Sequence, residues 1–229
     1  MKKEEVVKLF DQIYFNYDRA NTLLSLGIDR YWRHKMVSNI DKGSFRVLDA
    51  CCGTGSSSYS IYKASGQEAT VYGIDFSKKM LEVAKKRYNH YSPHLKFIFS
   101  DAASTNFEDN FFDTVAIAYG IRNITEREKA LTEFYRVTKH GGRLICLEFG
   151  YPRCRLVKWV YSFYLNLVLV NIGGLLGRNR PAYAYLVKSI KEFPAVTRFK
   201  EMIKSTGYHR VEVTALTFGI CNIYVAYKD

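Results

Sequence analysis

The residues best suited to chemistry lie in two short segments of the first third of the chain. Residues 46–55 read Arg-Val-Leu-Asp-Ala-Cys-Cys-Gly-Thr-Gly, and residues 72–75 read Tyr-Gly-Ile-Asp. Glycines let a ligand approach the backbone closely, and an acid that ends a second strand can bind both hydroxyls of a ribose. The spacing of Gly53, Gly55 and Asp75 therefore predicts a β-α-β unit that binds a nucleoside.

The glycine turn also distinguishes between nucleoside ligands. A dinucleotide-binding turn needs a third glycine, where this chain has Ser58. A phosphate-binding P-loop needs a lysine after the glycines, and this turn continues with serines. Asp49 would repel a pyrophosphate but can face the ammonium and sulfonium groups of S-adenosylmethionine. The pattern favours S-adenosylmethionine as the cofactor, and a turn without any ligand is the alternative.

A third acid follows the strand predicted at residues 95–99. In a doubly wound sheet, the carboxyl end of that strand borders the ligand crevice. The Asp101 carboxylate can accept a hydrogen bond from an adenine amino group, and the Ala102 amide can donate to a ring nitrogen. A simple turn residue is the other reading of this aspartate, but its place in a series with Asp49 and Asp75 favours the cofactor.

The fourth predicted strand ends in an arginine. Residues 116–123 read Ala-Ile-Ala-Tyr-Gly-Ile-Arg-Asn, and this strand end faces the transferable methyl group in a methyltransferase of this architecture. Arg122 can stabilise an oxyanion that forms on the substrate, or it can be a surface residue paired with an acid such as Glu126. The Asn/Asp-Pro-Pro-Tyr motif of enzymes that methylate nucleic-acid bases is absent, so we expect no nucleic-acid partner.

Strand and helix patterns alternate along the chain and must position these residues. The predicted strands are 46–50, 70–74, 95–99, 114–118, 142–149, 210–216 and 220–227. The predicted helices include 56–64, 78–88 with Ser77 as its N-cap, a helix from a Thr125 capping box to about 139, and 195–205. Five β-α units followed by a hairpin predict an α/β, doubly wound, seven-stranded sheet with an antiparallel end, which is the class I methyltransferase (Rossmann-like) architecture.

Two segments lie outside this core, although we expect a single domain over residues 1–229. Residues 1–40 have a helical pattern with many aromatic residues, which predicts a helical cap. Residues 151–193 form a predicted lid insertion between the fifth and sixth strands. Within it, the eighteen residues Trp159–Leu176 carry no charge, a length that can span a membrane. Asparagines and glycines interrupt this stretch, so we expect a buried or membrane-touching amphipathic lid helix instead.

Composition and charge limit the class of protein. Hydrophobic residues make up 48% of the 229 residues and charged residues 24%, which is typical of a globular domain. The charged N-terminus lacks a secretory signal pattern, and the five cysteines lack zinc-ligand spacing. We therefore expect a cytoplasmic protein with no metal site. The net charge is +12. Residues 151–229 carry 12 of the 34 Lys and Arg but only 4 of the 22 Asp and Glu. This basic last third can face an anionic membrane, or it can simply increase solubility.

Several motifs together resemble the UbiE/MenG family of quinone C-methyltransferases. Residues 17–32 read Tyr-Asp-x-x-Asn-x-x-x-Ser-x-Gly-Ile-x-Arg-x-Trp, which is similar to the family's opening signature. Gly-Ile-Arg-Asn at 120–123 is similar to its Gly-Leu-Arg-Asn, and residues 141–149 and 182–194 resemble its fifth strand and its lid. The resemblance spans about residues 10–227.

The resemblance implies which residues hold S-adenosylmethionine. Family members bind it through positions that correspond to Thr54, Asp75, Asp101 and Ala102. They often have a serine where this chain has Ala118, so a side-chain contact to the cofactor is lost there or replaced by backbone.

The resemblance also implies a substrate, a polyprenyl quinol that is methylated on its ring, with demethylmenaquinol as the expected acceptor. The adjacent Cys51 and Cys52 resemble menaquinone-pathway members more than the Gly-Gly of many ubiquinone-pathway members. Arg122 would stabilise the phenolate, Asn123 would orient the ring oxygen, and Tyr17 would cover the methionine end of the cofactor. The alternatives are the ubiquinone pathway, another small molecule, a nucleic acid, or a module without activity.

The lid and the basic last third suggest how a quinol with a long tail is handled. An apolar lid can guide the isoprenoid chain while basic residues make peripheral contact with the inner face of an anionic membrane. The lid departs from the family at one point, because Val170 stands where the family has a proline, and a longer lid helix can follow. The sequence leaves open whether two copies form a homodimer.

Overall fold

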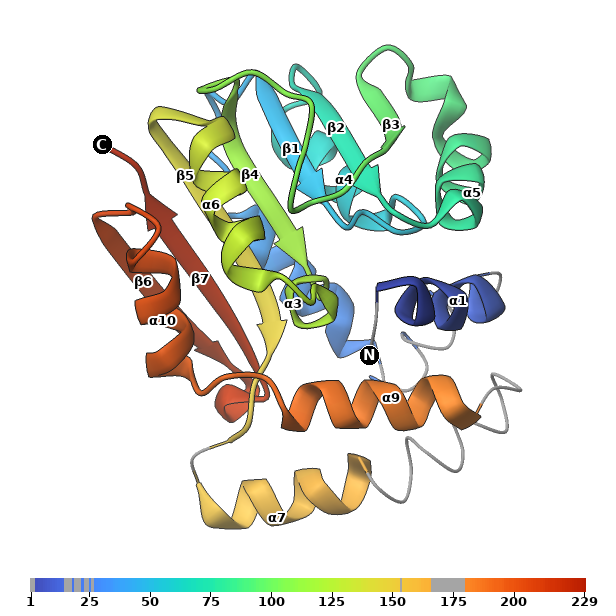
Figure 1. Cartoon of the computed structure of the whole chain (residues 1–229), viewed down its shortest axis with the longest axis vertical. Coiled ribbons are helices and arrows are strands. Elements are labelled where there is room, and N and C mark those ends of the chain that lie inside the picture. Colours follow the sequence, from blue (N-terminus) through green and yellow to red (C-terminus); the bar gives the residue numbers. More distant parts are fainter. Residues whose placement is uncertain are drawn as a thin grey trace.

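One seven-stranded sheet with helices on both faces forms the body of the protein (Figure 1). The computed structural model describes residues 3–14, 18, 22, 25, 27–152, 154–165 and 180–229. The strands are β1 Arg46–Ala50, β2 Thr70–Asp75, β3 Leu95–Phe99, β4 Phe112–Ala118, β5 Thr138–Phe149, β6 Arg210–Leu216 and β7 Cys221–Tyr227. The helices are α1 Lys3–Ile13, α3 Ile28–Val37, α4 Ser56–Ala64, α5 Lys78–Tyr88, α6 Arg127–Val137, α7 Arg155–Phe163, α9 Arg180–Lys191 and α10 Val196–Lys204. Short 3-10 helices lie at η1 Asn89–Tyr91, η2 Ile121–Asn123 and η4 Thr217–Gly219.

The strand order is β3-β2-β1-β4-β5-β7-β6, which confirms the predicted doubly wound sheet. Strands β1 to β5 are parallel, and β7 runs antiparallel to its neighbours β5 and β6. The chain builds outward from β1 to β3 and then returns to place β4 on the other side of β1. Ligands of such sheets bind where the strand order reverses, so the topology directs attention to the carboxyl ends of β1 and β4.

The strand boundaries follow the apolar pattern of the sequence. Strands β1, β3 and β6 have the predicted bounds, and the other strands begin or end within a few residues of the prediction. The side chains of Val47 and Leu48 in β1 and of Ile117 in β4 are fully buried. Central parallel strands are covered on both faces, which explains their unbroken apolar runs.

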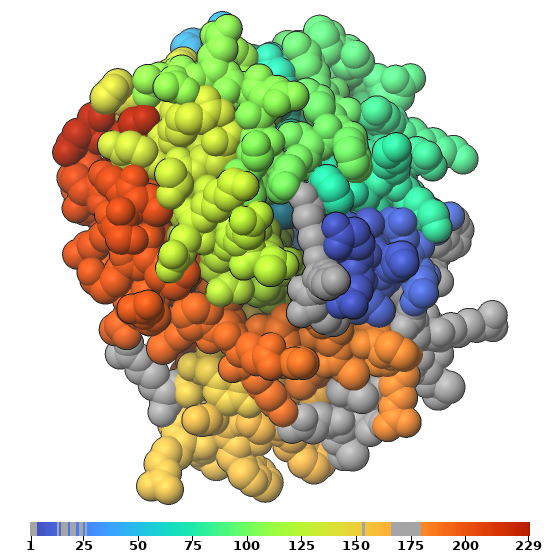
Figure 2. Space-filling model, in the orientation of Figure 1, coloured from blue at the N-terminus to red at the C-terminus, as the bar shows by residue number. Residues whose placement is uncertain are grey.

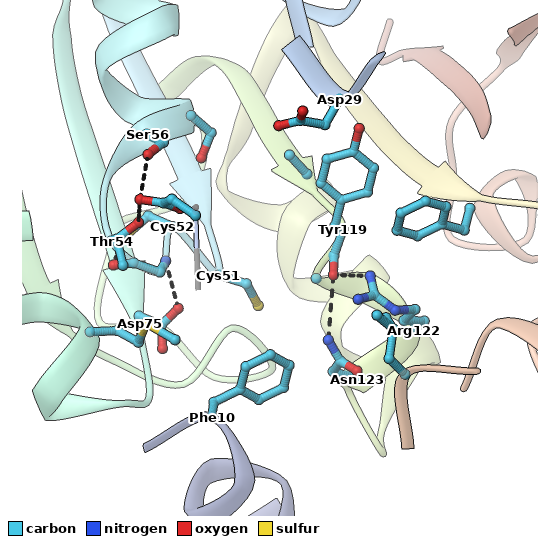
Figure 3. Close-up of a pocket in the computed structure, with 18 of the residues that line it drawn as sticks. Phe10, Asp29, Cys51, Cys52, Thr54, Ser56, Asp75, Tyr119, Arg122 and Asn123 are labelled. Atoms are coloured by element: carbon cyan, nitrogen blue, oxygen red, sulfur yellow. Dashed lines mark hydrogen bonds between the residues drawn. The ribbon is translucent and has the colours of Figure 1, made fainter. Parts of the chain in front are cut away.

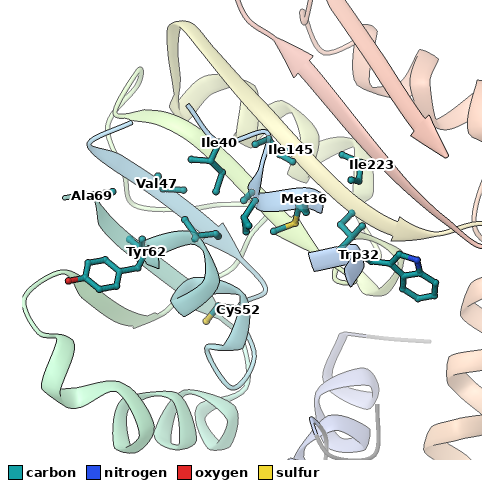
Figure 4. Packing of buried hydrophobic residues seen from close by; sticks show 14 of the residues in the cluster. Trp32, Met36, Ile40, Val47, Cys52, Tyr62, Ala69, Ile145 and Ile223 are labelled. Carbon is teal, nitrogen blue, oxygen red and sulfur yellow. The ribbon is translucent and has the colours of Figure 1, made fainter. Parts of the chain in front are cut away.

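Two separate hydrophobic clusters cover the two faces of the sheet. Trp32 of α3 and Val47 of β1 both belong to the first cluster, which Figure 4 shows. Leu48, the next residue of β1, belongs to the second cluster with Leu131 of α6 and Phe199 of α10. Successive side chains of a strand point to opposite faces, so β1 holds both helix layers in place and fixes the turn that follows it.

Helix starts were predicted with mixed success. Ser77 caps α5 as expected, because its Oγ accepts a hydrogen bond from the Met80 amide at 3.1 Å. The capping box at Thr125 is wrong, since α6 begins at Arg127 and its N-cap residue, Glu126, makes no side-chain cap bond. The Arg127 guanidinium explains the later start. It donates to two carbonyl oxygens of η2, at 3.1 and 3.2 Å, and thereby holds the first residue of the helix against η2.

The ends of β1 and β4 approach each other closely. A Cβ atom at Gly120, just after β4, would lie 2.5 Å from the Cβ of Cys51, just after β1. Real Cβ atoms do not approach this closely, so a side chain at position 120 would force the two turns apart. Glycine at this position therefore lets the two strand ends share one site.

Helices α1 and α9 lie beyond the carboxyl ends of the parallel strands, with α7 outside α9 (Figures 1 and 2). Helix α1 contacts α5 and α9, and α9 contacts η2. Side chains of α7, of α9 and of the residues just after α7 share a small apolar cluster that contains Tyr161, Leu165, Tyr183, Val187 and Ile190. The predicted cap and lid segments thus supply the helices that face the strand ends.

The predicted lid helix is described in part. Helix α7 covers the first residues of the uncharged stretch that begins at Trp159, and Val170 with the rest of residues 166–179 lies outside the described residues. Across the described ranges, no helix has the length and apolar character needed to cross a membrane.

Candidate active site

A cavity of about 1270 Å³ opens at the carboxyl ends of β1, β2 and β4 (Figure 3). Its other walls include residues of α1, α3, α4, α5, α7 and α9. Pockets for one drug-sized ligand usually measure about 300–1,000 Å³. The volume here is sufficient for a nucleoside cofactor and part of a second molecule at the same time.

Most of the predicted site residues meet at this cavity. Its lining includes Gly53, Thr54, Asp75, Asp101, Ala102, Ala118, Arg122 and Asn123. Asp49 and Gly55 do not line it, and Tyr17 lies outside the described residues. In the part of the chain that the structure describes, no group of three or more His, Cys, Asp and Glu side chains could hold a metal ion.

Asp75 is fixed at the end of β2 by two backbone amides. Its Oδ2 accepts from the Gly53 amide at 2.9 Å, and its Oδ1 accepts from the Ser77 amide at 2.8 Å. Burial raises the pKa of Asp75 above its ordinary value, and the two amide bonds oppose that shift. Each carboxylate oxygen has a second lone pair, so Asp75 can still accept hydrogen bonds from the hydroxyls of a bound sugar.

Asp101 combines a turn role with a place on the cavity wall. Its Oδ1 accepts from the Ala103 amide at 3.0 Å, and Asp101 and Ser104 form an isolated bridge that closes the turn after β3. The turn holds Ala102 and Ala103 against the sheet, where both are buried. The position of Asp101 is therefore compatible with both roles predicted from the sequence, a turn residue and an acceptor for the cofactor.

Asp49 lies behind the glycine turn, inside the protein. Its Oδ2 accepts from the hydroxyls of Ser57 at 2.7 Å and Ser58 at 2.6 Å, in the first turn of α4. Burial raises its pKa to about 6, although the two serine bonds lower it. Negative charge near a helix N-terminus is favourable, so in this structure Asp49 ties β1 to α4, and any effect on a cofactor would be exerted at a distance.

Gly55 shapes the turn by packing rather than by lining the cavity. It has a positive φ of 83°, and a Cβ there would lie 2.9 Å from the ring of Phe97 in β3. Because a side chain would be strained in both conformation and space, this glycine lets α4 begin close against the sheet.

Two non-glycine residues have left-handed backbones where β1 and β4 end. Cys51 and Tyr119 both have φ of 57°, a conformation that is uncommon for such residues and concentrates at functional sites. The ring of Tyr119 packs on Phe149, with centroids 4.9 Å apart, and its amide donates to the Leu147 carbonyl at 2.8 Å. Burial raises the pKa of the Tyr119 phenol and of the Cys51 thiol, so both groups remain protonated near neutral pH.

Arg122 forms a buried ion pair, and its partner is Glu148 of β5 rather than Glu126. Its Nη1 lies 2.9 Å from Glu148 Oε1, and the two side chains are 2% and 0% exposed. Glu148 also accepts from the backbone amides of Arg122 at 3.2 Å and Phe149 at 2.8 Å. The guanidinium further donates to the Tyr119 carbonyl. Arg122 lines the cavity while Glu148 does not, so the positive end of this pair is the one that faces a ligand.

Asn123 places an amide beside Arg122 (Figure 3). Its Nδ2 donates to the Tyr119 carbonyl at 3.4 Å. Its Oδ1 is buried and has no hydrogen-bond partner among the described residues. A buried acceptor without a partner is costly, so a hydroxyl donor on a ligand would be stabilised at this point.

The sequence-based predictions missed several polar residues of the cavity. Asp18 accepts hydrogen bonds from Thr54 and Ser56 and pairs with Arg87, and all four line the cavity. Asp18 stands within the 17–32 motif, but nothing in that motif indicates its partners. Arg87 ends a basic run on α5, a pattern that normally marks a solvated helix face.

A second missed group comes from α3. Asp29 accepts from Ser25 Oγ at 2.8 Å and lies 3.4 Å from Arg33. Asp29 and Arg33 both line the cavity. Spacing of four residues places the two on one face of a helix, and this is the signal that could have revealed the pair.

Comparison with known proteins gives one consistent family. The model of the ubiE/COQ5 methyltransferase family matches residues 1–228. A demethylmenaquinone methyltransferase of Geobacillus stearothermophilus is 36% identical, with 99% of this chain and 98% of that protein covered. The Geotalea daltonii protein named ubiquinone/menaquinone biosynthesis C-methyltransferase UbiE is 38% identical, with 99% and 97% covered.

Solved structures share the fold at low sequence identity. A SAM-dependent methyltransferase from Aquifex aeolicus matches with a TM-score of 0.59 and 17% identity, over 99% of this chain and 98% of that one. Phosphoethanolamine N-methyltransferase 2 of Haemonchus contortus, solved with S-adenosyl-L-methionine, matches with a TM-score of 0.60 and 20% identity, over 83% and 50%. These likenesses support the class I methyltransferase fold.

The buried carboxyl of Asp49 predicts a pH effect on stability. Its folded pKa of about 6 exceeds the ordinary 3.8, so between these values the folded chain binds more protons than the unfolded chain. The free energy of unfolding should therefore fall as pH rises through this window, by up to about 3 kcal/mol from this group. Asp49→Asn should remove that fall, as measured by urea unfolding at pH 4.5 to 7.5. Asp41→Asn, at an exposed acid, serves as the control, and parallel curves for wild type and Asp49→Asn would contradict the assignment.

Proposed function

The chain belongs to the ubiE/COQ5 methyltransferase family, and on that basis we propose that it methylates a ring carbon of demethylmenaquinol with S-adenosylmethionine as donor. The observation that carries this proposal is the shared cavity. Asp75 and Asp101 line one part of it, and Arg122 and Asn123 line another. One chamber can therefore hold a nucleoside donor beside an acceptor that has ionisable hydroxyls.

The residues present fit S-adenosylmethionine. Asp75 suits the ribose hydroxyls, Asp101 and the Ala102 amide suit the adenine, and the turn at Gly53 and Thr54 leaves room for the rest of the molecule. When bound, S-adenosylmethionine supplies an electrophilic methyl group on a sulfonium. Ala118 has no side-chain polar group, so any contact with the cofactor at this position must come from backbone.

Asn123 is suited to orient the acceptor ring. Its buried Oδ1 can accept a hydrogen bond from a quinol hydroxyl. This bond would fix the ring beside the end of β4. Holding two reactants in line converts a bimolecular step into an effectively unimolecular one and can supply much of the rate.

Arg122 is suited to stabilise the ring oxygen as its proton leaves. The resulting phenolate pushes electron density onto the ring carbon that forms the new bond. Arginine stays protonated at all ordinary pH values, so its role is electrostatic. Because Glu148 neutralises the pair as a whole, Arg122 would act as a fixed local dipole, which is favourable for a charge that develops during the reaction.

The menaquinone assignment follows the relatives. Proteins from Geobacillus stearothermophilus and Staphylococcus haemolyticus, 36% and 34% identical, are named demethylmenaquinone methyltransferases. The Cys51-Cys52 pair agrees with this assignment, as the resemblance implied. The Geotalea protein, whose name covers both pathways, keeps a ubiquinone precursor as the second candidate.

Helix α7 presents an apolar stripe to the outside, which supports contact with a membrane. The stripe consists of Leu156, Trp159, Val160 and Phe163, which are 69%, 69%, 52% and 56% exposed. Its spacing places all four on one helix face. Exposed patches of this kind mark interaction surfaces, and α7 carries Arg155 and Lys158 but no acid.

The α7 stripe also adjoins the reaction cavity. Val160 belongs to the stripe and lines the cavity, as do its neighbours Tyr161 and Tyr164. We infer peripheral attachment on the inner face of an anionic membrane, with the isoprenoid tail passing along α7. A homodimer formed through the same stripe is the alternative use of this surface.

Quinone chemistry in cells tests the function directly. Cells without this protein should accumulate a quinone one methyl group lighter, because no other step would add that methyl, and the wild-type chain should restore it. Asp75→Ala should fail to restore it, since loss of the ribose contacts should weaken cofactor binding at least about tenfold. Mass spectrometry of extracted quinones measures head group, methylation and tail together. An unchanged quinone in the deletion strain would contradict the proposal.

The Arg122–Glu148 pair predicts that single and double variants differ. Arg122→Ala leaves a buried, uncompensated carboxylate, which should lower the free energy of unfolding by about 3–5 kcal/mol. The double variant Arg122→Gln/Glu148→Gln removes both charges, so it should fold while turnover falls about 100-fold. Affinity for S-adenosylmethionine, measured by calorimetry, should stay within a factor of about two. Wild-type turnover in the double variant would remove Arg122 from the mechanism.

The α7 stripe predicts lipid binding that one residue can weaken. Trp159→Ser should weaken binding to vesicles of phosphatidylglycerol and phosphatidylcholine at least about tenfold in co-sedimentation, because an inserted aromatic side chain contributes roughly 1.5–3 kcal/mol. Phe45→Ser is the matched control, because Phe45 is 64% exposed and precedes β1 at the opposite end of the sheet. Equal, negligible binding of wild type to anionic and neutral vesicles would exclude the membrane. A change of mass in solution with Trp159→Ser would identify a dimer interface instead.

A further inference from the structure

A group of hydrogen-bond donors converges on one carboxylate oxygen beside the glycine turn. Asp18 Oδ2 accepts from Thr54 Oγ1 at 2.7 Å and from Ser56 Oγ at 3.1 Å, and it lies 2.5 Å from Arg87 Nη1. Figure 3 labels Thr54 and Ser56 at the edge of the cavity. We call Thr54, Ser56 and Arg87 the carboxylate niche.

The niche is assembled from separate elements. Thr54 belongs to the turn after β1, Ser56 is the first residue of α4, and Arg87 lies in the last turn of α5. Arg87 Nη1 also lies 3.3 Å from Ser56 Oγ, so the guanidinium and the hydroxyl are held together. Asp18 comes from the N-terminal part of the chain and is the one acid in this group.

The chemistry of the niche is selective. A guanidinium with two hydroxyl donors forms strong, charge-assisted hydrogen bonds to a carboxylate. The first residue of α4 adds the positive end of a helix. The Arg87 and Asp18 side chains are 41% and 28% exposed, and a surface ion pair of this kind contributes little to stability. A role in holding a ligand explains the convergence of three donors better than a role in holding the fold.

The glycine turn relates the niche to the nucleoside end of the cavity. The Gly53 amide donates to Asp75, and the next residue, Thr54, donates to Asp18. One side of this turn therefore faces the ribose acceptor and the other faces the niche. S-adenosylmethionine has a matching arrangement, because its nucleoside is joined through sulfur to an amino acid with a free carboxylate.

We propose that Thr54, Ser56 and Arg87 bind the carboxylate of S-adenosylmethionine, and that Asp18 is an internal carboxylate that competes for the same donors. This inference rests on the proposed function, because it concerns the same cofactor. Two carboxylates cannot share one set of donors without repulsion. Binding of the donor molecule therefore moves Asp18 away and couples cofactor binding to the N-terminal cap.

Decarboxylated S-adenosylmethionine provides the test, because it keeps the nucleoside and the sulfonium and lacks the carboxylate. Calorimetry should show that Arg87→Ala weakens binding of S-adenosylmethionine about tenfold and leaves binding of the decarboxylated molecule within about twofold. Lys86→Ala is the matched control, since Lys86 neighbours Arg87 on α5 and does not line the cavity. Circular dichroism should show the same fold for all three proteins.

Asp18→Ala should change the affinity for S-adenosylmethionine in the opposite direction to Arg87→Ala. Removing the competitor should tighten binding of S-adenosylmethionine about threefold, which corresponds to a modest electrostatic gain, and should leave the decarboxylated molecule unaffected. Equal weakening of both molecules by Arg87→Ala, or weaker S-adenosylmethionine binding in Asp18→Ala, would overturn the inference. If either result is found while the wild-type chain still methylates the quinone, the proposed function is retained and only the role of the carboxylate niche is rejected. If wild type binds neither molecule, both proposals fall.

Discussion

The contact between the ends of β1 and β4 is the constraint on which the site depends. Gly120 leaves space for Cys51, and both Cys51 and Tyr119 adopt left-handed backbones there. This contact brings the glycine turn and η2 to opposite sides of one cavity. Without it, the acids that suit a nucleoside and the arginine that suits a phenolate would lie in separate places, and the sheet would offer two half-sites instead of one.

Three acids near the site, Asp49, Asp75 and Glu148, have defined hydrogen-bond or ion-pair partners. Two serine hydroxyls hold Asp49, two backbone amides hold Asp75, and the guanidinium of Arg122 holds Glu148. Burial raises the pKa of both aspartates, so their ionised forms lower the free energy of unfolding. Such a cost is common where a protein keeps polar groups oriented for a ligand.

Local patterns predicted much of this architecture, and long-range contacts account for what they missed. Strand bounds and the Ser77 cap depend on neighbouring residues, so the sequence indicated them well. The Thr125 box failed because Arg127 reaches back to η2, a contact set by tertiary structure. Arg122 was expected at the site, but its partner lies 26 residues away on β5. Asp18 and Arg87 are 69 residues apart, and no spacing rule relates two residues at that distance.

The position of β7 has a consequence for the order in which the protein takes shape. β7 is the last strand in the chain but lies between β5 and β6, so β6 can join the sheet only after β7 has been made. Asn222 of β7 pairs in register with Glu148 of β5. A chain emerging from the ribosome at about 5–20 residues per second thus completes the β1–β4 half first. Strand β7, which covers the β5 edge at Glu148, is made last. A nascent chain therefore passes through a stage in which the Arg122–Glu148 pair is exposed to water.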